Sequence, residues 1–242
     1  MRRFEPQIAA AKADILLQRA ARRLGQHRRY FDAREAARAR LERLDLERNR
    51  ALGLLFVHVP KCGGSSVEAQ LGVFHGHRSE VYFRAADPGL FAAAWKFSIV
   101  RNPYDRLVSG FHYLKHHTRS ERDRAWADEV LGPCPDFAAF AARLAEPGFR
   151  GRVLAWLHFQ PQWYYLCDAR GRLMVDEVAR LEALAGFAAR FNAAGHAVTL
   201  DTRVRERPSA RAAWQEYYDA ATAATVADLY ARDFAIFGYP TG

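Results

Sequence analysis

The chain has 242 residues, of which 50% are hydrophobic, 13% aromatic and 26% charged. This composition excludes a disordered chain, because disorder requires few apolar residues. No apolar run approaches the roughly 18 residues that a membrane-spanning helix requires, and the N-terminus lacks the apolar core of a secretory signal. The odd count of three cysteines, Cys62, Cys134 and Cys167, argues against a disulfide framework. The cytoplasm is therefore the expected location.

Positive charge is concentrated in the first fifth of the chain. Residues 1–50 hold 14 Lys or Arg and 7 Asp or Glu, which leaves 22 and 20 for the rest. The segment is rich in good helix formers, so we expect a basic helical extension over 1–50 and a second domain over 51–242. Such an extension is a candidate for binding an anionic membrane surface. The alternative is a solvated helical face whose arginines pair with its own carboxylates.

From residue 52 onward, short apolar runs alternate with helical patterns. Strands are expected at 54–59, at 97–100 and within 173–181. Helices are expected near 67–71, 103–114, 136–144, 182–192 and 210–233. This alternation predicts an α/β fold with a central, mostly parallel sheet that is covered on both faces.

A glycine-rich turn joins the first predicted strand to the next helix. The turn contains Lys61, then Gly63 and Gly64, then Ser65 and Ser66. Backbone N–H groups, the N-terminus of a helix, a lysine and hydroxyl groups all suit an oxyanion. In the loop of nucleotide triphosphatases the lysine follows the glycines, whereas here it precedes them. The turn predicts an anion site of a different kind, and the alternative is a tight turn that merely needs glycine.

A second candidate anion contact follows the second predicted strand. Arg101 lies at the carboxyl end of that strand, where open α/β sheets bind their ligands, and its planar guanidinium suits phosphate. Ser109 lies two helical turns further on and is a candidate for the same anion. Arg106 is expected to be a structural ion-pairing residue.

Together these motifs resemble the carbohydrate branch of the sulfotransferases that use 3′-phosphoadenosine 5′-phosphosulfate. Residues 59–66 resemble the 5′-phosphosulfate loop of that family, with Cys62 in place of the common threonine, and 100–111 resemble its 3′-phosphate motif. Residues 74–77 resemble the His-Gly-His of heparan sulfate 2-O-sulfotransferases, whose second histidine is the catalytic base. Residues 158–162, 176–182 and 233–239 resemble the same branch, which includes bacterial family 2 proteins.

The resemblance implies a three-layer, P-loop-like α/β sandwich and transfer of a sulfuryl group to a hydroxyl, with a carbohydrate as the expected acceptor. It implies His77 and Lys61 as catalytic residues. The residues implied to bind the donor are Lys61, Cys62, Gly63, Gly64, Ser65, Ser66, Arg101, Ser109, Arg207 and Ser209. The candidates for binding the acceptor are His75, His158 and Gln162. Neither a metal nor nucleic acid is expected as a ligand.

Two other functions remain as alternatives at this point. A nucleotide or small-molecule kinase of related fold would require magnesium and a different phosphate loop. A non-catalytic adaptor that binds an anionic surface through residues 1–50 would explain the basic segment but not the later motifs.

Overall fold

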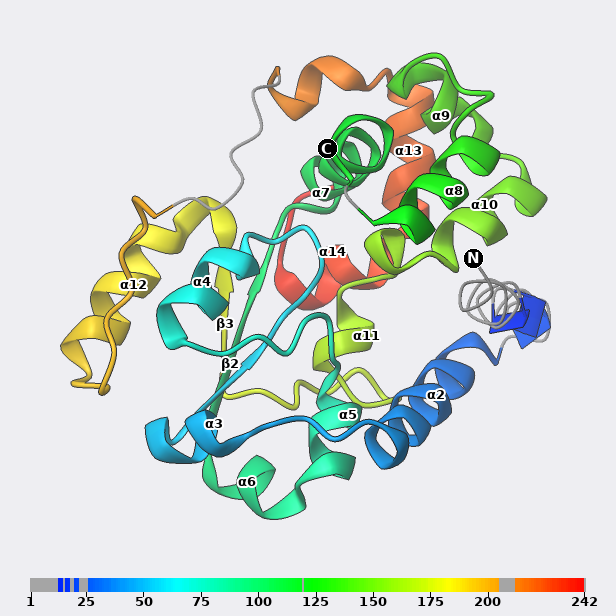
Figure 1. The fold of residues 1–242 in the computed structure, drawn as a ribbon. Coiled ribbons are helices and arrows are strands. Elements are labelled where there is room, and N and C mark those ends of the chain that lie inside the picture. Colours follow the sequence, from blue (N-terminus) through cyan, green and yellow to red (C-terminus); the bar gives the residue numbers. More distant parts are fainter. Residues whose placement is uncertain are drawn as a thin grey trace. The chain divides into compact units, whose positions relative to one another are not determined.

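The part of the chain that the computed structural model describes contains three short parallel strands and many helices (Figure 1). That part comprises residues 13–14, 16–17, 20–21, 26–118, 120–204 and 212–241. The chain divides into two compact units. The sheet unit is formed by Phe31–Asn102 and Gln162–Ala210, and the helical unit by Met1–Tyr30, Pro103–Pro161 and Arg211–Gly242.

The sheet has the order β1-β2-β3, with all neighbours parallel. The strands are β1 (Leu54–Val57), β2 (Trp95–Val100) and β3 (Glu177–Arg180), and they confirm the three predicted strands. In register, Val57 pairs with Ser98. Because parallel strands end at the same edge, the segments that follow β1 and β2 begin side by side. This edge carries the predicted glycine turn and Arg101.

Helices and an aromatic cluster support the sheet within its unit. Phe187 and Phe191 of α12 pack on Phe97 of β2, with ring centroids 5.6 and 5.5 Å apart, so α12 covers one face of the sheet. The further helices of this unit are α3 (Glu47–Leu52), α4 (Gly64–Leu71), α5 (Glu80–Ala86), α6 (Pro88–Ala93), α11 (Trp163–Leu166), the 3-10 helix η3 (Leu181–Ala183) and α12 (Leu184–Ala193).

The basic N-terminal segment contributes buried residues to the sheet unit. In α2 (His27–Leu41), the ring of Phe31 packs against Tyr164 and Tyr165. Glu35, 1% exposed, accepts hydrogen bonds from the backbone N–H and the hydroxyl of Ser79, both at 3.1 Å. The division into units therefore does not coincide with residue 50, and a separable extension over 1–50 stays a prediction.

The helical unit has a core of aromatic rings. Its helices are α7 (Pro103–His112), the π-helix η1 (Tyr113–His117), α8 (Glu121–Val130), α9 (Phe137–Arg143), α10 (Pro147–Leu154), η2 (Leu157–Phe159), η4 (Trp214–Tyr217), α13 (Ala220–Leu229) and α14 (Ala231–Phe237). α13 packs against α7 and α9 (Figure 1). The prediction of one helix over 210–233 was wrong, because Asp219 caps a new helix through Thr222 and the chain turns again at Tyr230.

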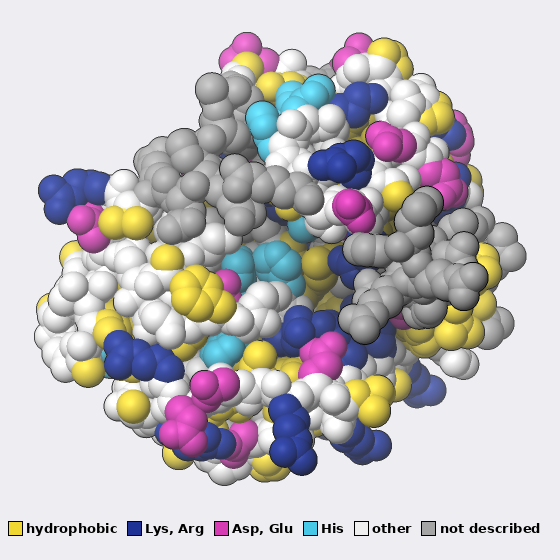
Figure 2. Space-filling model, in the orientation of Figure 1, with side chains coloured by type: hydrophobic (Ala, Val, Ile, Leu, Met, Phe, Trp, Pro, Cys, Tyr) yellow, Lys and Arg dark blue, Asp and Glu magenta, His cyan; other side chains and the backbone are white. Residues whose placement is uncertain are grey.

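Charges of both signs lie on the visible surface. In Figure 2, Lys and Arg side chains are interspersed with Asp and Glu rather than separated from them. Arg38 of α2 pairs with Glu35 of the same helix and with Glu42, which follows the helix, as the alternative for the basic segment requires. Among the described residues, no helix is both long enough and apolar enough to span a bilayer.

Candidate active site

The turn between β1 and α4 contains two residues with left-handed backbone conformation. Lys61 has a φ of 67° and Gly63 a φ of 77°. Glycine adopts this conformation readily, whereas a lysine does so only where the surrounding structure holds it, and such residues collect at ligand sites. The next residue, Gly64, begins α4, so the first N–H groups of the helix border the turn. These groups, with the Lys61 ammonium, are suited to an oxyanion.

Gly64 is required here by a neighbouring side chain. A Cβ atom at this position would lie 2.2 Å from Cδ2 and 2.5 Å from Nε2 of His58. No side chain fits at such distances, so the imidazole of His58 lies directly against the first residue of α4. His58 is 4% exposed. Sequence analysis had not identified this histidine as part of the site.

One buried carboxylate connects this histidine with the predicted base segment. Glu68 of α4 accepts a hydrogen bond at Oε2 from Nδ1 of His58, at 2.9 Å. Its Oε1 accepts the backbone N–H groups of His75 and Gly76, both at 3.0 Å. The carboxylate is 6% exposed and thus depends on these protein donors. Sequence analysis missed Glu68, and the available signal was an acidic residue on the helix that follows the turn.

The two histidines of the His-Gly-His segment differ in environment. His75 is buried and donates from Nε2 to Oδ1 of Asn49, and burial lowers its pKa despite the nearby Glu68 carboxylate. His77 is partly exposed, and its Nδ1 lies 3.3 Å from the carbonyl oxygen of His58. A carbonyl only accepts, so Nδ1 of His77 carries the proton and the neutral ring holds its lone pair on Nε2. Of the two, His77 has the geometry that suits a general base.

Arg101 lies beside the turn, as its place after β2 predicts. Its Nη1 donates to the Lys61 carbonyl at 3.3 Å. Its backbone is held by the Gln162 amide, which accepts the Arg101 N–H at Oε1 and donates to the Arg101 carbonyl from Nε2, each at 2.9 Å. The Cys62 thiol donates to the same Oε1 at 3.2 Å. The fully buried Gln162 thus joins the two predicted anion motifs, and its role toward an acceptor stays a prediction.

The remaining predicted donor ligands fall into three groups. Ser65 and Ser66 lie in the first turn of α4, next to Gly64. Ser109 lies on α7 in the helical unit, so its pairing with Arg101 of the sheet unit stays a prediction. Arg207 and Ser209 lie outside the described residues.

His158 belongs to a buried ion-pair network of the helical unit. Its Nε2 lies 3.1 Å from Oδ2 of Asp123, and both residues are 5% exposed. Its ring packs edge-on against Tyr113. Its predicted role toward an acceptor stays untested. Arg106, expected to be a structural ion-pairing residue, is 1% exposed and donates to the carbonyls of His158 and Gln160, at 3.4 and 2.6 Å.

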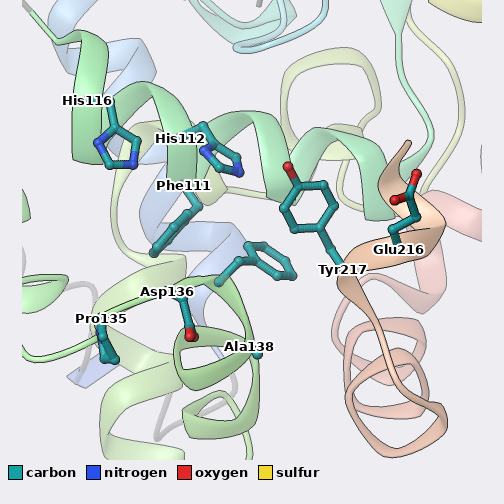
Figure 3. A pocket seen from close by; sticks show the side chains of 9 residues that line it. Phe111, His112, His116, Pro135, Asp136, Ala138, Glu216 and Tyr217 are labelled. Carbon is teal, nitrogen blue, oxygen red and sulfur yellow. The ribbon is translucent and has the colours of Figure 1, made fainter. Parts of the chain in front are cut away.

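A cavity of about 330 Å³ lies elsewhere in the helical unit. Figure 3 shows Phe111 and His112 of α7 and His116 of the following η1, with Tyr217 beside them. The rings of His112 and Tyr217 are 5.4 Å apart and edge-to-face. The remaining lining residues are Pro135, Asp136, Phe137, Ala138 and Glu216. Aromatic faces with a few polar groups are typical of small-molecule sites.

The fold is that of an α/β protein, and the turn at the edge of its sheet is suited to an anionic group. The described residues contain no cluster of three potential metal ligands. A family model described as "Sulfotransferase family" matches residues 45–240. The chain therefore belongs to the sulfotransferase family and is a transferase. No curated protein and no solved structure gives a significant match.

Proposed function

We propose that the protein transfers a sulfuryl group from 3′-phosphoadenosine 5′-phosphosulfate to a hydroxyl of a carbohydrate. Family membership supports sulfuryl transfer to a hydroxyl-bearing acceptor, and this family typically uses that donor. The observation that carries the proposal for the donor is the meeting of two anion motifs at one sheet edge, where Nη1 of Arg101 lies 3.3 Å from the Lys61 carbonyl.

The residues at this edge fit the two charged ends of the donor. The Lys61 ammonium, the N–H groups at the start of α4 and the hydroxyls of Ser65 and Ser66 would hold the phosphosulfate end. Arg101 would hold the 3′-phosphate through its planar guanidinium, which distinguishes this donor from ATP. Ser109, with Arg207 and Ser209, completes the proposed nucleotide contacts. The P-loop-like geometry and the three-layer arrangement belong to the same proposal.

Sulfuryl transfer is an in-line displacement comparable to phosphoryl transfer, so positioning and charge stabilisation supply most of the rate. His77 would accept the proton of the acceptor hydroxyl at Nε2 while the hydroxyl oxygen forms its bond to sulfur. The bond between sulfur and the 5′-phosphate oxygen breaks, and Lys61 stabilises the charge that develops on that oxygen. His77 then releases its proton to water.

The carbohydrate acceptor rests on the resemblance to the carbohydrate branch. The cavity of the helical unit is a candidate place for the sugar, because a volume near 330 Å³ accommodates a sugar ring and Tyr217 lines it. Tyr217→Ala should then raise the KM for a carbohydrate acceptor and leave the affinity for the donor unchanged. An unchanged acceptor KM would remove the cavity from the proposal.

Calorimetric titration tests the donor. The protein should bind 3′-phosphoadenosine 5′-phosphate without magnesium, and it should bind ATP more weakly because ATP lacks the 3′-phosphate. Preferential binding of magnesium ATP would instead favour the kinase alternative. A screen of hydroxyl-bearing acceptors with radiolabelled donor would then identify the acceptor class. The contact of residues 1–50 with anionic membranes also remains a proposal, which vesicle sedimentation at low and high salt would test.

A further inference from the structure

We propose that Glu68 is a positioning residue of the transfer site, and that it acts through His58 and through the segment that presents His77. This inference rests on the proposed function, because it assigns Glu68 a task in that reaction. One part of the inference concerns structure alone, namely that Glu68 holds His58 and the backbone of residues 75–76, and that it fixes the tautomer of His58. That part can be measured without any substrate.

The first argument is the distribution of donors around the carboxylate. Oε2 accepts from the imidazole of His58, while Oε1 accepts two consecutive backbone N–H groups, those of His75 and Gly76. The turn at residues 60–63, between β1 and α4, is called the anion turn here. One buried side chain therefore joins His58, which lies just before the anion turn, to the segment that carries His77. Because Glu68 also belongs to α4, it is rigidly connected to the residues that begin at Gly64.

The second argument is the position of the His58 ring between the two halves of the site. Its Nε2 edge lies against Gly64, where it leaves no space for a Cβ atom. Its ring centroid is 4.3 Å from that of His77, in an edge-to-face arrangement. The carbonyl of His58 also accepts the hydrogen bond that sets the tautomer of His77. A shift of His58 is thus transmitted to the anion turn and to the base together.

The third argument is that the donors around position 68 match the two oxygen atoms of a carboxylate. His75 and Gly76 present only donors, so they require an acceptor at Oε1. The carboxylate then offers a second acceptor to His58, which fixes the proton of His58 on Nδ1. A glutamine at position 68 would present its oxygen to the backbone and its NH₂ group to His58. Nδ1 of His58 would have to become an acceptor, and its proton would move to Nε2, next to Gly64.

The test is Glu68→Gln, examined by nitrogen-15 NMR of labelled histidine and by kinetics. The wild-type protein should show a protonated Nδ1 in His58, and the variant a protonated Nε2. Turnover in the variant should fall about tenfold to a hundredfold, the usual cost of a small misplacement of reacting groups. Affinity for 3′-phosphoadenosine 5′-phosphate should fall less than turnover does, because Glu68 is not proposed to touch either phosphate. An unchanged His58 tautomer, or normal turnover, would overturn the inference.

The chain offers a matched control in Asp123→Asn. Asp123 is also a buried carboxylate paired with a buried histidine, His158, but in the helical unit. This variant should leave the tautomer of His58 unchanged, and at saturating acceptor it should lower turnover less than Glu68→Gln does. If it lowers turnover as much as Glu68→Gln does, the loss reflects general destabilisation, and the inference fails.

A second pair of variants covers the case in which Glu68→Gln does not fold. Gly64→Ala should strongly weaken binding of 3′-phosphoadenosine 5′-phosphate, because the new methyl group collides with His58. Adding His58→Ala should restore much of that binding by making space. No recovery would contradict the proposed position of the His58 ring. If the wild-type protein binds no 3′-phosphoadenosine 5′-phosphate, the proposed function fails, whereas the tautomer of wild-type His58 still decides the structural part.

Discussion

Two buried histidine–carboxylate pairs, one in each compact unit, share their chemistry and differ in what surrounds them. In the sheet unit, Nδ1 of His58 lies 2.9 Å from Glu68, and in the helical unit, Nε2 of His158 lies 3.1 Å from Asp123. The four residues are 4–6% exposed. Neither the distance nor the burial separates the two pairs.

The two histidine–carboxylate pairs differ in the groups that contact their histidine rings. The His58 ring touches Gly64 at the start of α4 and stands against the ring of His77, whereas the His158 ring packs edge-on against Tyr113. The first pair borders an anion turn and a candidate base. The second lies next to a backbone carbonyl that anchors Arg106. We therefore expect the first pair to serve the transfer site and the second to serve stability, because the groups that adjoin them differ.

The largest effect is expected at the histidine beside the first pair. His77→Ala should lower turnover by roughly 10²–10⁴-fold, the usual contribution of a general base, while affinity for 3′-phosphoadenosine 5′-phosphate remains. Steady-state kinetics with an identified acceptor, together with calorimetry, would check both expectations. His75→Ala should cost less turnover, and the opposite order would place the base at His75.

Removal of Arg101, a proposed ligand of the 3′-phosphate, should change the affinity for the nucleotide and leave the proton transfer by His77 in place. Arg101→Ala should weaken binding of 3′-phosphoadenosine 5′-phosphate about tenfold to a hundredfold, because each charge-assisted hydrogen bond contributes roughly 1.5–3 kcal/mol. Calorimetry on the folded variant would measure the change. A folded Arg101→Ala protein with wild-type affinity would refute the assignment of the 3′-phosphate site.

The pair in the helical unit should affect stability instead of activity. Asp123→Asn leaves a buried histidine with a weaker partner, so the free energy of unfolding should fall by about 1–3 kcal/mol. Urea denaturation would measure this loss, and the turnover per folded molecule at saturating acceptor should change little. If Asp123→Asn abolished turnover in a folded protein, the two pairs would not be functionally different.

The smallest expected effect is the contribution of His75, which also contacts Glu68, to the pH dependence of the free energy of unfolding. Burial lowers the pKa of His75, so the folded state disfavours its charged form. The stabilising contribution of neutral His75 is complete above the unfolded value of about 6.5 and is lost as the pH falls below it. Denaturation at several pH values should show a weaker loss in His75→Gln than in the wild type. Equal pH profiles would mean that another group dominates the acid sensitivity.

The local features of the site could be predicted from the sequence. Apolar runs bounded by Pro60 and Arg101 predicted two strands, and the glycines predicted the turn, because each signal lies within a few consecutive residues. The break in the helix predicted over 210–233 was missed, although its capping residues Asp219 and Thr222 stand in the sequence.

The contacts that organise the site could not be predicted in this way. The packing of His58 against Gly64, and the bonds of Glu68 to His75 and Gly76, depend on where segments meet in three dimensions. Composition also failed to predict that the N-terminal segment contributes buried residues. Its arginines and alanines suggested a solvated extension, although Glu35 is buried within the sheet unit.

The thiol of Cys62 in the anion turn allows local opening of this turn to be measured. Cys62 is 1% exposed and lies in the turn between β1 and α4. An alkylating reagent can reach its sulfur only when the turn opens locally, so the rate of modification measures how often that happens. Cys134 and Cys167 are fully buried elsewhere, and peptide mass spectrometry would separate the three signals. A nucleotide that binds the closed turn should slow the alkylation of Cys62 selectively, which makes donor binding measurable before any acceptor is known.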